Sequence, residues 1–206
     1  MKKNQIVNYI VGTVAIIVVF PLSLVNCNSQ KPVLNTNPET LTGIQRGDAP
    51  WPPETSSLKK RLKEIGLPAL TREGVVLHTH EHLDIFVAGK QVPVPSDIGI
   101  SNAAGFIAPI HIHDETAMIH VESPTSRAFD LGQFFDIWGV LFTGDCMGGY
   151  CSHGDKSLEV FVNGSSFRGD PRTIELKDHE EIVVTFGTSE ELPNPIPSSY
   201  AFPPEY

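Results

Sequence analysis

The sequence predicts an α+β fold in which a mostly antiparallel sheet carries one covering helix and a short helix precedes the sheet. Segments of alternating apolar and polar residues recur between residues 75 and 187, and this period of two is typical of half-buried strands. The clearest turn signal is Asn163-Gly164, because this dipeptide favours a two-residue hairpin. Residues 131–137 look helical and bring large aromatic side chains that suit packing on a sheet.

The length and composition favour one globular domain with flexible ends. The chain has 206 residues, of which 40% are hydrophobic and 19% are charged, as in ordinary globular proteins. We expect four segments: a signal peptide or membrane anchor at 1–26, a flexible tether at 27–55, a globular histidine-rich α+β domain at 56–190, and a proline-rich tail at 191–206.

The first half of the expected domain holds a short helix, a long strand and two hairpins. Ser56 or Ser57 can cap a helix that reaches about Ile65, where Gly66 and Pro68 stop it. Three extended segments follow: a strand over 75–87 that turns at 88–91 into a short strand at 92–94, and a further hairpin over 109–122.

The second half holds the covering helix and two more strands. The helix begins after Ser126–Asp130 and Gly139 ends it. Leu158–Val162 alternates as a strand does and leads into the Asn163-Gly164 turn, and Val183–Phe186 forms the final strand.

The N-terminal segment indicates export. Lys2 and Lys3 precede an apolar stretch over residues 10–24, which is typical of a secretory signal. Residues 24–27, Leu-Val-Asn-Cys, are similar to a bacterial lipobox, and we therefore expect Cys27 to be lipidated and the protein to be tethered to the membrane. An uncleaved membrane anchor is the alternative, because the apolar stretch nearly reaches the length of a membrane-spanning helix.

The charge balance argues against nucleic acid as a partner. The formal net charge is −9 at pH 7, and no basic run is present that would neutralise phosphates. The sequence names no protein partner.

The histidines form the most informative pattern of the chain. Seven of the eight fall between residues 78 and 153, and five of these stand at every second position in two runs. Residues two apart share a face of a strand, so we expect one imidazole face and one apolar face. If the hairpin closes around Thr116-Ala117, it places His113 opposite His120 and His111 opposite Glu122.

These residues predict a transition-metal site, because imidazole suits both copper and zinc. Asp84 and Glu122 can act as ligands or as acceptors that fix the imidazole tautomers, whereas His179 is expected to be an ordinary surface residue. The candidate ligands are His78, at the start of its strand, and His80, His82, His111, His113, His120 and Glu122.

The two remaining cysteines allow two interpretations. Cys146 and Cys151 form a disulfide in an oxidising compartment, which is the interpretation we favour. Alternatively, they join His153 and Met147 in a second, softer metal subsite.

Four segments together resemble a family of exported bacterial proteins that have a histidine-rich domain. The segments are His78–Val87, Ile119–Pro124, Leu131–Gly139 and Cys146–Cys151. The resemblance runs from about Trp51 to Gly187 and implies a common domain and an exported protein, but no particular reaction or ligand. The order of hairpin, helix and later strands is also similar to a β-grasp arrangement, an analogy of fold alone.

The sequence therefore predicts a membrane-tethered protein of the bacterial cell envelope that binds a copper or zinc ion for storage, delivery or sensing. The first alternative is a zinc- or copper-dependent enzyme, in which Glu81, Glu115 or Glu122 acts as a general base. The second is an envelope interaction module without a metal. Metal retention and the effect of a chelator on thermal stability discriminate among these classes.

Overall fold

The computed structural model of the protein describes residues 37–204 and 206. The expected signal peptide or anchor and the expected lipid site at Cys27 lie outside these residues. Within them, no helix has the length and apolar content that crossing a membrane requires. The helices are α1 (Leu58–Glu64) and α2 (Leu131–Trp138), with short 3-10 turns η1 (Pro38–Thr40) and η2 (Pro171–Thr173).

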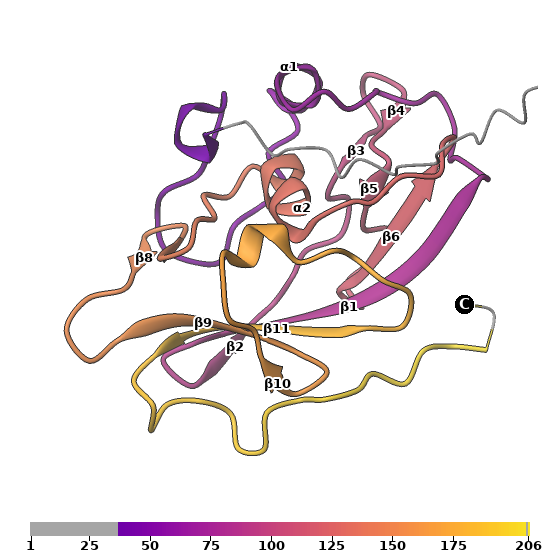
Figure 1. The fold of residues 1–206 in the computed structure, drawn as a ribbon. Helices are drawn as coiled ribbons and strands as arrows, with labels where there is room; N and C mark the ends of the chain where they lie inside the picture. Colours follow the sequence, from indigo (N-terminus) through magenta and orange to yellow (C-terminus); the bar gives the residue numbers. More distant parts are fainter. Residues whose placement is uncertain (1–36, 205) are drawn as a thin grey trace, which may run out of the picture. The chain divides into compact units, whose positions relative to one another are not determined.

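A mixed sheet in the order β10-β9-β11-β1-β6-β5, with β2 also paired to β1, forms the centre of the fold (Figure 1). Only the pairing of β1 with β11 in this sheet is parallel, so the predicted α+β class and mostly antiparallel sheet are confirmed. The β-grasp likeness remains a prediction. The strands of this sheet are β1 (Leu77–Val87), β2 (Lys90–Val92), β5 (Ile110–His111), β6 (Met118–Ser123), β9 (Ser157–Val162), β10 (Ser165–Ser166) and β11 (Glu181–Gly187).

Two short hairpins complete the strands, namely β3 (Ile100–Ser101) with β4 (Phe106–Ile107) and β7 (Cys146–Met147) with β8 (Tyr150–Cys151). Two tight turns of the main sheet follow from local sequence. Asn163 and Gly164 have φ values of 50° and 75° between β9 and β10, and both positions of such a turn require positive φ. Ala88-Gly89 turns β1 into β2 in the same way, with φ values of 47° and 73°.

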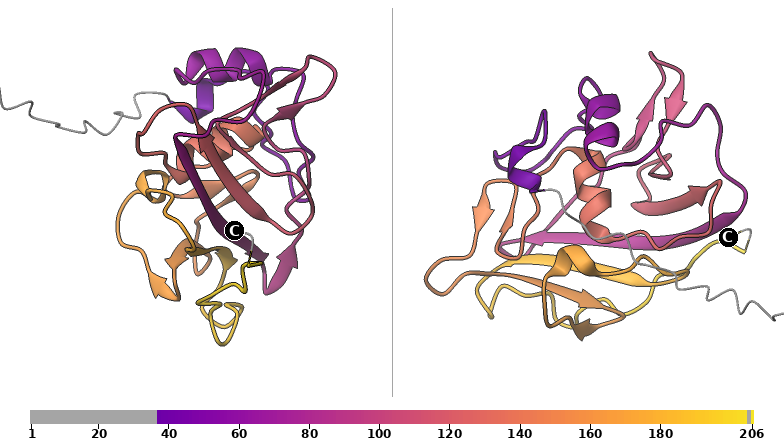
Figure 2. Two further views of the ribbon diagram at one scale, coloured as in Figure 1. Left: turned by 90° about the vertical axis from the view of Figure 1, so that its right-hand side faces the viewer. Right: turned by 45° about the horizontal axis from the view of Figure 1, so that its top comes forward.

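The covering helix α2 packs on one face of the sheet, as Figures 1 and 2 show. Its Phe134 and Phe135 belong to one buried cluster with Leu83 of β1 and Val184 of β11. The backbone N–H of Asp130 donates to the Gln133 side chain at the start of the helix, and Gly139, at φ 83°, ends it. Only glycine adopts this left-handed conformation without steric cost.

The short helix α1 packs against α2 and is anchored by a buried arginine. Arg61 is fully buried, and its guanidinium donates to the backbone carbonyls of Asp136 (2.8 Å) and Ile137 (3.0 Å) at the end of α2. It also pairs with Glu54. These contacts satisfy carbonyls that the last turn of a helix leaves without intrahelical donors.

The predicted tether, residues 27–55, is instead packed against the domain over its described part, 37–55. Trp51 is 2% exposed, and its ring meets that of Trp138 edge-to-face at 5.9 Å. The Trp138 indole N–H donates to the Trp51 carbonyl (3.2 Å). The segment has no helical or strand periodicity, so its packing could not be predicted from the sequence pattern. The large aromatic surface of Trp51 holds the segment against the domain.

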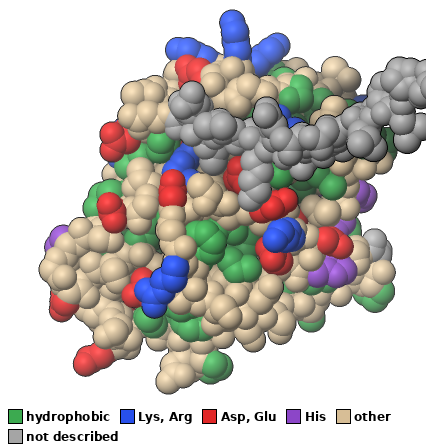
Figure 3. Space-filling model, in the orientation of Figure 1, with side chains coloured by type: hydrophobic (Ala, Val, Ile, Leu, Met, Phe, Trp, Pro, Cys, Tyr) green, Lys and Arg blue, Asp and Glu red, His purple; other side chains and the backbone are tan. Residues whose placement is uncertain are grey.

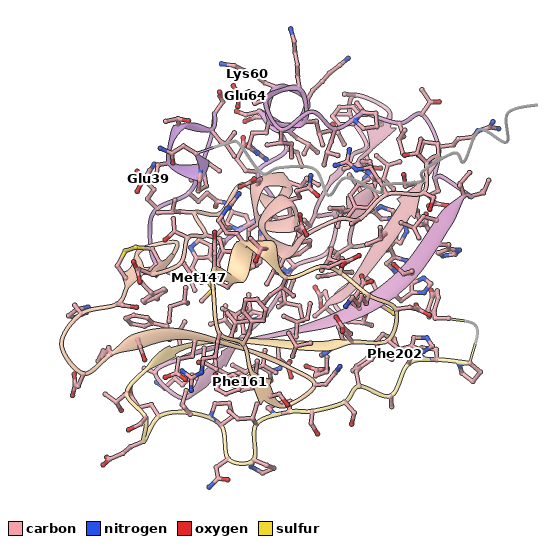
Figure 4. The ribbon with its side chains drawn as sticks, in the orientation of Figure 1. Glu39, Lys60, Glu64, Met147, Phe161 and Phe202 are labelled. Carbon is pink, nitrogen blue, oxygen red and sulfur yellow. A yellow bond between two sulfur atoms is a disulfide. The ribbon has the colours of Figure 1, made fainter. Side chains whose placement is uncertain are left out.

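The proline-rich tail, expected to be a flexible end, is extended and packs against the domain. Its described residues, 191–204 and 206, contain no helix or strand. In Figures 1 and 2 this segment, drawn in yellow, follows the face of the sheet opposite α2. Figure 4 labels one of its aromatic residues, Phe202, whose ring stacks on His179 with 4.7 Å between centroids.

Candidate metal centre

The alternation of β1 divides its side chains between the core and an imidazole face. Leu83 and Ile85 are fully buried in the core. His80 and His82 belong to the even-numbered positions, which point to the other face, and are 4% and 7% exposed. Successive residues of a strand point to opposite faces, so the histidine row lies on the face that the tail follows. The predicted division into two faces is therefore found.

Two neighbouring strands add further histidines to this face. In the antiparallel pairing of β1 with β6, His80 lies opposite His120 and His78 lies opposite Glu122. In the pairing of β5 with β6, His111 also lies opposite His120. Directly opposed side chains share one face of a sheet. His120 is therefore flanked on both sides by histidines from other strands.

The register of the β5–β6 pair differs from the predicted one. We expected His113 opposite His120 and His111 opposite Glu122, with a tight turn at Thr116-Ala117, but His111 pairs with His120. The connection is a loop over residues 112–117, in which Ala117 has a φ of 62°. A shift by two residues keeps every side chain on its face, so the same groups still gather.

Glu122 lies at the centre of the gathered side chains. Its Oε1 is 3.0 Å from His78 Nε2 and 3.8 Å from His120 Nδ1, and its Oε2 is 3.7 Å from His111 Nε2. Within each sequence pair, the Nε2 atoms of His78 and His80 are 3.1 Å apart, and those of His111 and His113 are 3.0 Å apart. Two nitrogens bound at about 2.0 Å to one tetrahedral zinc ion are about 3.3 Å apart. The spacing therefore fits shared ligation.

Two buried polar atoms of the cluster have no hydrogen-bond partner within the part of the chain that the structure describes. His120 Nδ1 and Glu122 Oε2 are both buried and form no hydrogen bond there. Buried polar atoms are normally hydrogen-bonded, and exceptions indicate a strained site or a bound ion or water. Their position among imidazole nitrogens favours a cation as the missing partner.

The environment lowers the pKa of two cluster imidazoles, those of His80 and His111. Burial, together with the neighbouring His120 and His78, lowers the pKa of His80 to about 4. Burial, with the neighbouring His113, lowers the pKa of His111 to about 3. The His111 Nδ1–H donates to the Ala108 carbonyl at 3.0 Å, which leaves Nε2 with a free lone pair toward the cluster. An acceptor on the other ring nitrogen, as the Ala108 carbonyl is here, orients a metal-binding imidazole.

His82 lies apart from this cluster although it continues the same row. Its Nδ1 is 2.7 Å from Glu181 Oε2, and its ring stacks on Tyr200 of the tail at 3.8 Å with 5° between planes. His82, Asp84 and Glu181 form a separate group whose ligand atoms lie within 4.8 Å of one another. Burial raises the pKa of Glu181, against the lowering effect of His82.

The tail contributes aromatic residues that sequence reasoning missed. The Tyr206 ring lies 4.4 Å from the His80 ring and 5.5 Å from the His120 ring, between centroids. The sequence separates Tyr206 from His80 by most of the domain and marks the tail only as proline-rich. The presence of three aromatic residues in the tail, Tyr200, Phe202 and Tyr206, is the one available signal, and it does not indicate which residues they contact.

The cysteine hairpin does not join the histidine cluster. Cys146 and Cys151 form a disulfide, as favoured from the sequence; it is the yellow bond in Figure 4. Met147 is fully buried in the core, and His153 is exposed, with its Nδ1 2.7 Å from the Cys151 carbonyl. Oxidised cysteines supply no thiolate, so the alternative soft subsite of Cys146, Cys151, His153 and Met147 is not formed. In Figure 3 histidine side chains, in purple, lie at opposite edges of the molecule.

Glu81 lies within the histidine run but does not share its face. It is fully buried on the core side, where it receives a hydrogen bond from the Thr79 hydroxyl (2.9 Å). Burial raises the pKa of Glu81 to about 8, so this carboxyl is mainly protonated at neutral pH. Glu115, the other glutamate proposed as a base, is exposed in the loop after β5.

The described residues form several groups in which one ligand atom from each member lies within 4.8 Å of the others. His179, as expected, is exposed and belongs to none of them. The groups that share the imidazole cluster are His78, His80, His120 and Glu122; His111, His113 and His120; and Glu73, His111, His113 and Glu122.

No protein-family model matches the chain, and neither a curated protein nor a solved structure is significantly similar to it. The resemblance to exported histidine-rich proteins therefore remains a prediction.

Proposed function

We propose that this protein binds a transition-metal ion, zinc or copper, outside the cytoplasm, for storage, delivery or sensing. The observation that carries the proposal is the convergence of imidazoles from β1, β5 and β6 around Glu122, with buried nitrogen and oxygen atoms that form no hydrogen bond within the described residues. Water-facing histidines of an ordinary strand would not be buried. His80, His111 and His120 are 4%, 0% and 4% exposed.

The donor set favours zinc or copper(II) among biological cations. Magnesium and calcium prefer oxygen ligands, whereas imidazole nitrogens with one carboxylate suit zinc and copper. Thiolates would favour copper(I), but Cys146 and Cys151 are joined to each other. The lowered pKa values of His80 and His111 support binding at neutral pH, because ligation requires a neutral imidazole.

The disulfide supports an exported protein, because such bonds persist in oxidising compartments. We extend this to the bacterial cell envelope on the basis of the N-terminal signal pattern, the lipobox-like Cys27 and the resemblance described above. Tethering through a lipid on Cys27, or through an uncleaved anchor, is part of this proposal.

The surroundings of the cluster favour binding over catalysis. Of the three glutamates offered as a general base, Glu81 faces the core. Glu115 belongs to none of the groups of described residues whose ligand atoms lie close enough together to hold a metal ion. Glu122 lies among the imidazoles, with its Oε1 3.0 Å from His78 Nε2, a position that suits a ligand more than a base. The tail aromatics also contact the cluster rings and narrow the approach for a substrate.

The test is metal retention by the full-length protein. The protein is stripped with a chelator, loaded with zinc or copper(II), dialysed, and analysed for bound metal at pH 7.5 and pH 5. We expect zinc or copper to be retained at pH 7.5 and largely retained at pH 5, because the pKa values of His80 and His111, about 4 and about 3, lie below both and ligation requires a neutral imidazole.

The matched control is the double variant His153→Ala/His179→Ala, which removes two exposed histidines outside the cluster. It should retain as much metal as the unmodified protein. Retention of zinc or copper(II) by the unmodified protein after dialysis at neutral pH supports the proposal. If the unmodified protein keeps neither ion, the proposal is overturned.

A further inference from the structure

The imidazole cluster has two halves that come from different strands. The β1 half holds His78 and His80, and the β5 half holds His111 with the adjacent His113. Each half belongs to its own group of side chains whose ligand atoms lie within 4.8 Å of one another and could hold a metal ion. Among the described residues no such group contains histidines of both halves. His120 and Glu122 of the central strand β6 occur in groups of both kinds.

The two carboxylate oxygens of Glu122 face different halves. Oε1 is 3.0 Å from His78 Nε2, and Oε2 is 3.7 Å from His111 Nε2. Oε2 is buried and forms no hydrogen bond within the described chain. A carboxylate whose oxygens point to separate pairs of nitrogens has the geometry of a bridging ligand.

The number of donors also exceeds the needs of one ion. Zinc in proteins binds four ligands, or three with an exchangeable position, whereas the cluster offers five imidazoles and a carboxylate. Divided between two ions, the same donors give each ion two imidazoles and one carboxylate oxygen. His120 lies between the halves, with its ring 4.7 Å from both the His80 and the His113 rings, and can complete either shell.

We propose that the cluster is a dinuclear centre, in which Glu122 bridges one transition-metal ion held by His78 and His80 and another held by His111 and His113. The inference rests on the proposed function and specifies its site. Carboxylate-bridged ions lie about 3.5–4 Å apart. With no more than four protein ligands each, both ions keep a position open to water or an exchanging ligand.

The first test is the number of zinc ions retained by the full-length protein after loading and dialysis. We expect two per chain, and one per chain in each of the double variants His78→Ala/His80→Ala and His111→Ala/His113→Ala. The control His153→Ala should keep two. One ion in the unmodified protein overturns the dinuclear centre and leaves the proposed function standing, whereas no ion overturns both.

The two double variants also test the division itself. If one of them loses all the metal while the other loses none, the donors form a single site and the inference is wrong. The thermal unfolding transition of each variant shows that it is folded before its metal is counted.

The bridge is tested without any variant by electron paramagnetic resonance of the copper(II)-loaded protein. A carboxylate-bridged pair gives a magnetically coupled spectrum with less signal than two isolated ions. Two uncoupled copper(II) signals of full intensity overturn the bridge. Glu122→Gln, whose neutral amide offers only one oxygen, should lose the coupling; a coupled pair that persists in this variant overturns the role of Glu122.

Discussion

The histidine cluster was predicted as a metal site, whereas the cysteine hairpin was predicted as a disulfide with a soft metal subsite as the alternative, and the two regions have different outcomes. In the cluster, residues from three strands gather around Glu122 with their nitrogens turned toward one another. In the hairpin, Cys146 and Cys151 pair with each other, Met147 enters the core and His153 is exposed.

The difference shows what makes a set of ligand-type residues converge. In the cluster, two strand pairings place His80 and His111 on either side of His120, so the sheet itself fixes the geometry. In the hairpin, adjacent side chains point to opposite sides, and Met147 follows the apolar side. The hairpin is thus a structural element, and the comparison yields four predictions.

The largest expected effect comes from the aromatic side chain that supports the hairpin. Trp51→Ala removes a side chain that packs between Trp138 and Gly148, where a Cβ on Gly148 would lie 2.5 Å from the Trp51 ring. We expect the free energy of unfolding to fall by about 3–5 kcal/mol, measured by urea unfolding. A change below about 1 kcal/mol would show that residues 37–55 are a tether after all.

Removal of the central imidazole tests the cluster. His120→Ala removes an imidazole that occurs in metal-binding groups with each half. We expect the affinity for zinc to fall by more than about 100-fold, because loss of a residue that merely hydrogen-bonds to a ligand already costs about 10- to 100-fold. Competition with a zinc-binding dye measures it. His153→Ala is the control from the hairpin and should leave the affinity unchanged; equal losses in both variants would contradict the comparison.

Removal of the disulfide tests whether the hairpin stabilises the fold without taking part in metal binding. The double variant Cys146→Ser/Cys151→Ser should lower the free energy of unfolding by about 2 kcal/mol, because the closed loop is short. Metal content, measured on the same preparation, should not change. A variant that loses metal while remaining folded would make the cysteines part of the metal site.

The last prediction is a dependence of stability on pH, and it concerns a residue that interrupts the histidine run but faces the core. The folded-state pKa of Glu81, about 8, lies above its ordinary value of 4.5. Its contribution to stability is therefore complete below about pH 4.5 and is lost as the pH rises through about 8. Glu81→Gln should remove this decline, whose slope is at most about 1.4 kcal/mol per pH unit.

Urea unfolding from pH 5 to pH 9 compares the two proteins, and metal content should be the same in both. Identical pH profiles would show that Glu81 ionises normally and is not enclosed by the core. The result distinguishes the core face of β1, which affects stability, from its imidazole face, which is proposed to bind metal, just as the preceding variants distinguish the hairpin from the cluster.

Much of the fold was predictable because its signals are local. The helix α2, the long strand β1 and the Asn163-Gly164 turn all lie where periodicity and turn chemistry place them. The packing of residues 37–55 was not predictable, because Trp51 is held by contacts with Trp138 and Gly148, far along the chain. The same applies to the stacking of Tyr200 on His82.

The candidate site divides in the same way. The sequence placed His78, His80 and His82 on one face, and they are on one face, but it could not tell that His82 turns to Glu181 while His78 turns to Glu122. Those partners come from β11 and β6, whose pairing with β1 depends on the packing of the whole sheet.

By itself, the sequence determined which residues share a face and that Cys146 and Cys151 can pair, because a strand repeats every two residues and a short loop brings neighbours together. Only the tertiary structure decided which histidines meet, that Glu122 lies between them and that the tail crosses their face. The physical reason is that strand register and long-range order are set by the burial of the opposite, apolar face, and no local segment contains that information.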